Sequence, residues 1–208
     1  MRLWRVWAPG AEVMRIVGGR LSGRRFSAPL GRGTRPTSDR VREALGSALE
    51  ARNAFGDAQV LDLFAGTGAL SFEALSRGAK HSVLVEQDPG AIRQINQSAK
   101  ELGLAGKIRT IRLDLLADPS GVIRKLPATE SSFTLLFADA PYSDTDSVSA
   151  LLNALTASGR LAPGALLVVE HSATHDWRWP KGLAPEADYR YGQTGISLGV
   201  YAPGKGPQ

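Results

Sequence analysis

The chain has 208 residues and 43% of them are hydrophobic, which is the scale of one α/β domain with a substantial core. It has no cysteine, which excludes disulfides and thiolate sites, and no stretch resembles a signal peptide or a membrane span, so we expect a cytoplasmic protein without membrane contact. The formal charge is +5 and arginine far outnumbers lysine, which favours partners that carry phosphate groups.

The amino-terminal segment divides at Met14. Residues 1–13 show no hydrophobic period, so we expect a disordered tail there, or a true translation start at Met14. Eight arginines lie between Arg15 and Arg42, against the single acid Asp39, and glycines interrupt the run. This pattern predicts a small hairpin and a mobile loop whose cationic face suits a phosphate backbone; a solvated basic face without a partner is the alternative.

A helix is predicted next, over residues 38–51. Thr37 or Ser38 can cap its start, and Asp39 in its first turn interacts favourably with the helix dipole. Apolar residues at helical spacing give the helix one buried face, formed by Val41, Leu45, Ala48 and Leu49. We expect this helix to cover one edge of a ligand site.

Residues 60–70 form the centre of the predicted fold. An apolar run broken by Asp62 predicts a buried parallel strand, Gly66 and Gly68 predict a tight turn, and a helix follows over residues 69–77. Strand, glycine turn and helix together make a nucleotide-type site, because the free N–H groups at the start of the helix face the ligand.

The acids near this turn favour a cationic ligand over a pyrophosphate. The third glycine of a dinucleotide motif is absent, since Ser71 stands in its place. Asp62 repels phosphate but attracts the ammonium group of S-adenosylmethionine. Glu86, which ends a predicted strand over residues 79–86, can accept hydrogen bonds from ribose hydroxyls. The alternative is a doubly wound domain whose two acids are incidental.

A third strand, over residues 107–113, is predicted after a helix over residues 89–102. Asp114 follows this strand and can accept a hydrogen bond from an adenine amino group. A loop acid or a helix cap is the alternative for this residue. Because the carboxyl ends of parallel strands meet at one edge of a sheet, Asp62, Glu86 and Asp114 are expected to converge.

A fourth strand, over residues 133–138, delivers a short polar and aromatic segment to the same edge, namely Asp139, Ala140, Pro141 and Tyr142. We expect the catalytic residues in this segment. Tyr142 can stack on a planar base while Asp139 accepts from its exocyclic amine. The alternative is a strand-end turn with an exposed tyrosine.

The carboxyl-terminal third completes the sheet. A helix over residues 144–155, a turn over residues 162–164 and a fifth strand over residues 165–170 are predicted. A closing antiparallel hairpin follows, and residues 202–208 are expected to be a disordered tail. The three histidines share no metal-ligand spacing, so no metal site is predicted.

Several motifs together resemble one family, the RsmD-type 16S rRNA guanine-N2 methyltransferases. The resemblance covers residues 14–201, and its most specific part is the basic segment followed by the glycine turn. The motifs that carry it are Met14-Arg15-Ile16-Val17-Gly18-Gly19, Arg35-Pro36-Thr37-Ser38-Asp39-Arg40-Val41-Arg42-Glu43, Asp62-Leu63-Phe64-Ala65-Gly66-Thr67-Gly68, Val85-Glu86-Gln87-Asp88, Asp139-Ala140-Pro141-Tyr142 and Tyr191-Gly192-Gln193-Thr194.

The resemblance implies a Rossmann-like class I methyltransferase fold: one α/β domain over residues 14–201, with a seven-stranded, mostly parallel sheet, an antiparallel last strand and a small basic RNA-binding extension over residues 14–36. It implies S-adenosylmethionine as donor and, as acceptor, a guanine of 16S rRNA within an assembling small ribosomal subunit. We expect the protein to act as a monomer.

The resemblance also assigns site residues. Those implied for the cofactor are Asp62, Phe64, Gly66, Gly68, Glu86, Gln87 and Asp114. Those implied for the flipped guanine and its methylation are Asp139, Ala140, Pro141 and Tyr142. The arginines expected to bind RNA are Arg15, Arg20, Arg24, Arg25, Arg35 and Arg40.

One residue departs from the family pattern. The family tetrapeptide is Asp-Pro-Pro-Tyr, and Ala140 replaces its first proline. The carbonyl of Ala140 can still accept from the amine, but a less rigid turn that shifts the base by about an ångström lowers the rate around a hundredfold. Two alternatives stay open: adenine-N6 methylation of DNA, because the tetrapeptide suits any exocyclic amine, and an rRNA-binding assembly factor without catalysis, which Ala140 suggests.

Overall fold

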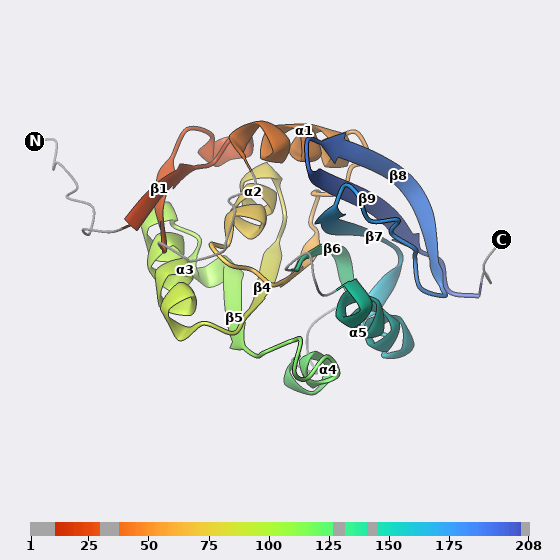
Figure 1. The fold of residues 1–208 in the computed structure, drawn as a ribbon. Helices are drawn as coiled ribbons and strands as arrows, with labels where there is room; N and C mark the ends of the chain where they lie inside the picture. The colour runs from red at the N-terminus through yellow and green to blue at the C-terminus, as the bar shows by residue number, and fades with distance from the viewer. Residues whose placement is uncertain (1–10, 30–37, 127–131, 141–144, 205–208) are drawn as a thin grey trace, which may run out of the picture.

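A computed structural model of the chain describes residues 11–29, 38–126, 132–140 and 145–204. Strands and helices alternate through most of it and build one twisted sheet with helices on both faces (Figure 1). The helices are α1 (Asp39–Glu50), α2 (Ala69–Arg77), α3 (Pro89–Leu102), α4 (Gly121–Lys125) and α5 (Thr145–Ala157), with 3-10 turns η1 (Gly19–Leu21) and η2 (Ala105–Lys107). The strands are β1 (Ala11–Arg15), β2 (Arg25–Pro29), β3 (Gln59–Leu63), β4 (His81–Glu86), β5 (Ile108–Arg112), β6 (Phe133–Asp139), β7 (Leu161–Ser172), β8 (Leu183–Tyr191) and β9 (Thr194–Tyr201).

The main sheet has seven strands in the order β5-β4-β3-β6-β7-β9-β8. Strands β3 to β7 are parallel to one another, and β9 is antiparallel to both of its neighbours. This confirms the predicted Rossmann-like sheet with an antiparallel last strand. The strand order reverses between β3 and β6, and doubly wound sheets bind ligands beside such a reversal, at the carboxyl ends of the strands.

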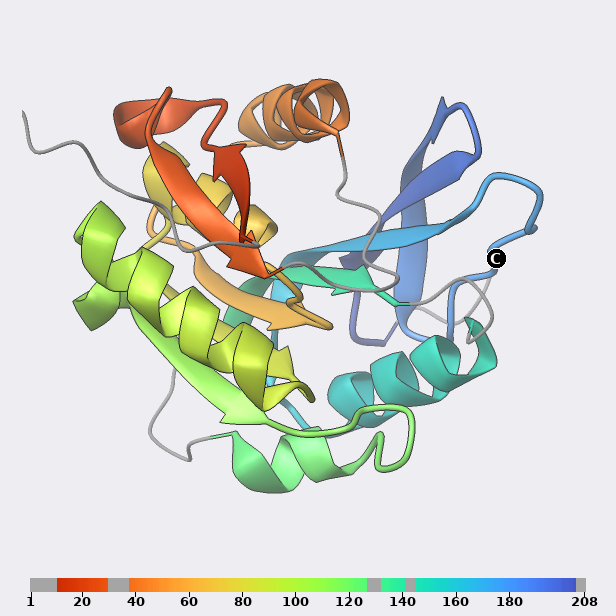
Figure 2. The same cartoon turned by 60° about the vertical axis from the view of Figure 1, so that its left-hand side comes forward.

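Both faces of β3, β4 and β6 are largely buried, which is why these strands read as nearly continuous apolar runs, whereas the edge strand β5 is partly exposed. On one face Val60 and Leu135 pack with side chains of α1, α2 and α3, and on the other face Leu61 and Leu136 pack with α4 and α5. Figure 2 shows the β1–β2 hairpin next to α3, with α4 and α5 on the other side of the sheet. No helix in the described ranges combines the length and the apolar character that a membrane span needs.

The predicted amino-terminal hairpin is formed by β1 and β2. Its first strand begins at Ala11, three residues before the expected domain boundary at Met14. Four of its side chains belong to the same core cluster as those of α1, α2 and α3, namely Met14, Ile16, Leu21 and Phe26. Phe26 meets Phe72 of α2 edge-on, with ring centroids 5.1 Å apart. The hairpin is thus part of the core, while the loop expected after it (residues 30–37) lies outside the described residues.

Local capping signals account for the helix boundaries. The Oγ of Ser38 accepts a hydrogen bond from the N–H of Val41 at 3.3 Å and caps α1 as predicted. The Oδ1 of Asp88 accepts from the N–H of Ala91 at 2.6 Å at the start of α3, which ends at Gly103 in the left-handed region. The predicted ranges of α2 and α3 are confirmed.

One boundary prediction is wrong. Residues 162–164, predicted to form a turn, lie within the long strand β7. The register between β6 and β7 shifts in this region, and such a bulge tolerates Pro163, which has no N–H to donate to a neighbouring strand.

Candidate functional site

Four predicted acids lie at the carboxyl ends of neighbouring parallel strands. Asp62 is in β3, Glu86 ends β4, Asp114 follows β5 and Asp139 ends β6. Because the order of these strands is β5-β4-β3-β6, their carboxyl ends meet at one edge of the sheet, and the four acids share it. The structure adds an acid that the sequence does not single out, Glu170 in β7, which is the register partner of Asp139.

The glycine turn is built from left-handed backbone. Gly66 has φ 53° and Gly68 has φ 77°, and Phe64 has φ 64°, which is unusual for a bulky side chain. A β-carbon on Gly68 would lie 3.2 Å from the ring of Phe72 and 3.3 Å from Leu84. The turn therefore brings the start of α2 close to the end of β3. Bulky residues with a left-handed backbone, such as Phe64, are found most often at functional sites.

The side chain of Asp62 is directed into the protein. The residue is 1% exposed, and its Oδ2 accepts a hydrogen bond from the Oγ of Ser71 at 2.6 Å. The Oγ of Ser71 lies 2.8 Å from the Oγ of Ser82 in β4. Burial raises the pKa of Asp62 to about 7, against hydrogen bonds from the hydroxyl and the backbone N–H of Ser71. Asp62 thus holds the start of α2, where Gly68 provides no side-chain cap.

Glu86 joins the glycine turn to the start of α3. Its Oε2 accepts from the N–H of Gly66 at 2.8 Å. Its Oε1 accepts from the N–H groups of Gln87 and Asp88 at 2.8 and 2.9 Å. The carboxylate is partly exposed, so it can still present lone pairs to a ligand, and Gln87 beside it is exposed.

Asp114 caps its own loop. Its Oδ1 accepts from the N–H groups of Leu116 and Ala117 at 3.0 and 3.1 Å. Within the described residues its Oδ2 makes no hydrogen bond, so one oxygen is available at the edge of the sheet. Asp114 therefore caps the backbone after β5, which is the alternative that the sequence leaves open, and its second oxygen can still accept a hydrogen bond from a ligand.

Asp139 lies near two other acids of this edge, Glu170 and Asp62. Burial, the charge of Glu170 and the charge of Asp62, in that order, raise its pKa well above the usual value. Ala140, which replaces the proline of the family tetrapeptide, is buried and packs with the core on the α5 side. Pro141 and Tyr142 lie outside the described residues.

The arginines predicted to bind RNA differ in their surroundings. Arg20, Arg25 and Arg40 are exposed. The Nε of Arg15 donates to Asp39 at 2.6 Å, and Arg24 donates to the carbonyl oxygens of Glu101 and Leu102 at the end of α3, at 2.6 and 3.2 Å. Arg35 lies outside the described residues.

Sequence reasoning misses a buried charge network beneath the hairpin. Arg42, expected on a basic surface, is 2% exposed and donates to Glu73 in α2 at 2.9 Å. Glu73 also accepts from the N–H groups of Val17 and Gly18 at 2.6 and 3.2 Å. One turn further along α2, the Oγ of Ser76 donates to the carbonyl of Gly18 at 2.6 Å. Glu73, an acid flanked by apolar residues within α2, is the signal that could have indicated this network.

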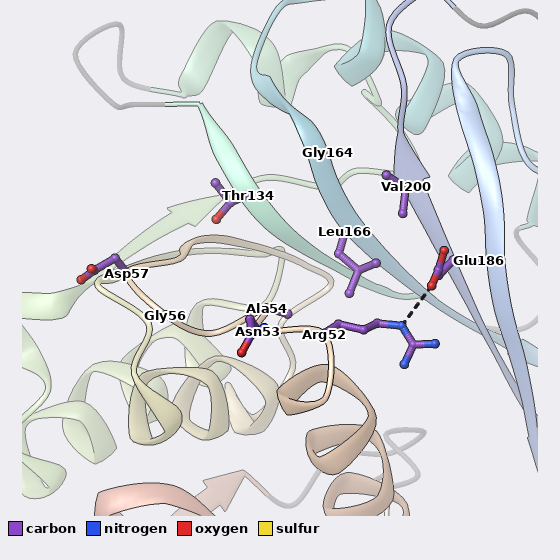
Figure 3. Close-up of a pocket in the computed structure, with 10 residues that line it drawn as sticks. All are labelled: Arg52, Asn53, Ala54, Gly56, Asp57, Thr134, Gly164, Leu166, Glu186 and Val200. Carbon is purple, nitrogen blue, oxygen red and sulfur yellow. Dashed lines mark hydrogen bonds and ion pairs between the residues drawn. The ribbon is translucent and has the colours of Figure 1, made fainter.

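The structure also contains a hollow of about 340 Å³ away from these acids (Figure 3). It is lined by residues of the loop before β3, including Arg52 and Asp57, and by Thr134 and Glu186. Thr134 is at the amino end of β6, whereas Asp139 is at the carboxyl end, so the hollow lies at the opposite edge of the sheet. We therefore assign the chemistry to the carboxyl-end edge. Among the described residues no cluster of His, Asp or Glu could hold a metal ion.

Comparison with known proteins finds one family model and several similar chains. A family model described as conserved hypothetical protein 95 matches residues 14–200. The chain is 36% identical over 161 residues to ribosomal RNA small subunit methyltransferase D of Escherichia coli, covering 77% of this chain and 76% of that protein. It is 31% identical over 186 residues to a putative rRNA methyltransferase of Bacillus subtilis, covering 89% and 97% of the two chains. A solved structure, a putative methyltransferase from Escherichia coli, superimposes with a TM-score of 0.77 at 30% identity, covering 92% of this chain and 99% of that one.

Proposed function

The chain belongs to the family described as conserved hypothetical protein 95, that of the RsmD-type methyltransferases, and we propose that it methylates the exocyclic N2 of a guanine in 16S rRNA. The donor is S-adenosylmethionine, and the acceptor is the rRNA of an assembling small ribosomal subunit in the cytoplasm, on which the protein acts as a monomer. One observation carries the proposal: Asp139 ends the strand beside the reversal of strand order, at the same edge as the glycine turn.

The residues of the edge fit a cationic donor with an adenosine group. The turn of Gly66 and Gly68, with Phe64 before it, holds the methionine part, and the ammonium group of the donor favours the ionised form of Asp62 next to the turn. Glu86 and Gln87 bind the ribose, and the free oxygen of Asp114 accepts from the adenine amine. A phosphate-containing cofactor fits poorly, because the acids at this edge repel it.

Methylation then follows from how Asp139 holds the base. Asp139 and the carbonyl of Ala140 accept the two hydrogens of the guanine amine and direct the nitrogen lone pair at the methyl group, which bound S-adenosylmethionine supplies in electrophilic form. Positive charge develops on the nitrogen as the bond forms, and the carboxylate stabilises it more in the transition state than in the ground state. Tyr142 stacks on the flipped base, and Pro141 stiffens the turn.

The cationic hairpin places the RNA. Arg20, Arg25 and Arg40 are exposed and contact the phosphate backbone together with Arg35, while Arg15 and Arg24 contribute charge from positions already tied to Asp39 and to the end of α3. These contacts give affinity, and the contacts of Asp139 and the residues after it with the base give the choice of base.

Replacing Asp139 by asparagine tests the assignment. With assembling small subunits as substrate and isotope-labelled donor, transfer should fall at least about a hundredfold, while the donor still binds in isothermal titration calorimetry. Asp57→Asn, at the opposite edge of the sheet, is the matched control and should retain transfer. Undiminished turnover by Asp139→Asn would contradict the assignment.

Two other functions remain testable with the same material. The tetrapeptide suits any exocyclic amine, so preferential methylation of deoxyoligonucleotides would favour adenine-N6 methylation of DNA. A failure to bind S-adenosylmethionine would favour an rRNA-binding assembly factor without catalysis. Primer extension across small-subunit rRNA from a deletion strain identifies the modified nucleotide.

A further inference from the structure

Ser76, in the last turn of α2, bonds to the backbone of the β1–β2 hairpin at two points. Its Oγ donates to the carbonyl oxygen of Gly18 at 2.6 Å and accepts from the N–H of Leu21 at 2.9 Å. Ser76 is 3% exposed, and the side chain of Leu21 is also buried. The two bonds enclose the 3-10 turn η1, whose central residue is Arg20.

The hydroxyl of Ser76 takes the place of a bond that a turn usually makes within itself. In a turn of four residues the carbonyl of the first residue commonly accepts from the N–H of the fourth, and Gly18 and Leu21 are the first and the fourth here. The Oγ of Ser76 bonds to both of these groups, so a side chain of α2 becomes part of the turn. The conformation of the backbone at Arg20 is therefore set from outside the hairpin.

The two glycines before Arg20 allow the turn to lie directly against α2. Gly19 has φ 73°, and a β-carbon on it would clash with the carbonyl group of Ser76. A β-carbon on Gly18 would clash with the guanidinium group of Arg77. Side chains larger than hydrogen would force the turn away from the helix. The pair of glycines that the sequence singles out thus serves the contact between the hairpin and α2.

Arg20 itself is exposed, although the residues on both sides of it are held. Gly19 lies against α2, and the side chain of Leu21 belongs to the core. A flexible side chain loses conformational freedom when it binds a partner, and this cost is smaller when its backbone is already fixed. The turn therefore presents a cationic side chain to solvent from a backbone that is fixed in advance.

Building on the proposed function, in which Arg20 contacts the RNA backbone, we propose that Ser76 is a positioning residue for that contact. Its hydroxyl holds η1 in the conformation from which the guanidinium group of Arg20 reaches a phosphate of the rRNA. Ser76 is seven residues after Ala69, the first residue of α2, and so about 10 Å along the helix from the glycine turn. The same helix thus sets the distance between η1 and the turn for the donor.

A double-mutant cycle on rRNA binding tests this proposal. In Ser76→Ala the carbonyl of Gly18 and the N–H of Leu21 can bond directly to each other, so the hairpin still folds but the turn changes shape. Filter binding of 16S rRNA at one fixed salt concentration should weaken about threefold in Ser76→Ala and about fivefold in Arg20→Gln. In the Arg20→Gln background Ser76→Ala should cause no further loss, because it acts through Arg20.

Two controls separate positioning from a general loosening of the hairpin. Ser98→Ala removes another buried hydroxyl, which α3 donates to the carbonyl of Ser27 in β2 at 2.8 Å, and its effect on binding should be the same with and without Arg20. Ser76→Ala in the Arg25→Gln background should keep its threefold loss, because Arg25 lies beyond the turn in β2.

Ser76→Cys is a second variant that retains the volume at this position, since its thiol fills the space of the hydroxyl but is a weak donor. It should couple to Arg20 in the same way and should leave the KM for S-adenosylmethionine unchanged. Losses that multiply in the variants combined with Arg20→Gln, or wild-type binding by both Ser76 variants, would overturn the proposal. A wild type that binds rRNA but transfers no methyl group would instead overturn the proposed function, and the cycle would still measure the coupling.

Discussion

The Nη1 of Arg42 lies 2.9 Å from the Oε1 of Glu73, and both side chains are shielded from solvent. The pair joins α1 to α2, and the carboxylate of Glu73 at the same time holds the backbone of Val17 and Gly18. A buried ion pair contributes little net stability compared with apolar residues, but removing one partner leaves an uncompensated charge. This relationship makes Arg42 a structural residue within a basic segment.

Arg42→Met should therefore lower the free energy of unfolding by about 3 kcal/mol, because Glu73 is left buried without its nearest cation and only Arg77, at 3.7 Å, remains close. Urea denaturation measures the loss. Arg124→Met breaks the exposed pair between Arg124 of α4 and Asp118, which precedes the helix, and should cost at most about 1 kcal/mol. Equal losses in the two variants would mean that the buried pair is no more important than a surface one.

Asp62 should make stability fall as pH rises. Its folded pKa of about 7 is above the ordinary aspartate pKa of 3.8, so its contribution is complete below pH 4 and is lost as pH rises to 7. The shift corresponds to about 4 kcal/mol. Asp62→Asn, which carries no charge at any pH, should unfold at higher urea concentration than the wild type at pH 8, and the advantage should vanish near pH 4.

The control for that experiment is Asp57→Asn, an exposed acid at the opposite edge of the sheet. It should leave the pH dependence of unfolding as it is in the wild type. A wild type and an Asp62→Asn variant whose curves run parallel from pH 4 to pH 8 would show that Asp62 does not titrate in this range.

Gly68→Ala should weaken the binding of S-adenosylmethionine about tenfold and lower the free energy of unfolding by about 2 kcal/mol. An alanine there has to adopt φ 77°, and its β-carbon crowds Phe72 and Leu84. Calorimetry and urea denaturation measure the two effects. Gly106→Ala, at a glycine of η2 around which the structure is open, should change neither. Wild-type affinity in Gly68→Ala would show that the turn does not position the donor.

Arg20→Gln combined with Arg25→Gln should weaken RNA binding and reduce the dependence of log K on log salt by roughly 0.7 to 0.9 for each phosphate that the protein no longer neutralises. Both side chains are exposed, so thermal stability should not change. Arg24→Gln offers the contrast, because it removes the hydrogen bonds to the end of α3 and should reduce stability as well. An unchanged salt slope in the double variant would place the RNA elsewhere on the surface.

Local signals are predictable from this sequence and distant partners are not. Ser38, Asp88 and Gly103 set helix ends through hydrogen bonds to residues at most four positions away, and their roles follow from sequence alone. The shared edge of Asp62, Glu86 and Asp139 follows from the rule that parallel strands end together. The neighbours that each acid contacts cannot be predicted in this way, because they depend on the order of the strands in the sheet and on the face to which each side chain points.

Arg42 and Glu170 show what is missing. The run of arginines predicts Arg42 on a cationic surface, whereas its burial depends on Glu73, which is 31 positions away. Glu170 ends an apolar run and gives no sign that Asp139 is beside it, since that contact exists only once β6 and β7 pair. Asp62 lies at the predicted edge, but its bond to Ser71 cannot be inferred from the spacing of apolar residues.

Helix α2 has nine residues and is about 14 Å long, and its two ends contact different parts of the structure. Its first turn follows the glycine turn, and Glu73 and Ser76 further along the helix form hydrogen bonds with the backbone of the hairpin. The turn that we propose for the methyl donor and the hairpin that we propose for the RNA are therefore attached to the same short helix, so a displacement of the hairpin would move the helix that borders the donor turn.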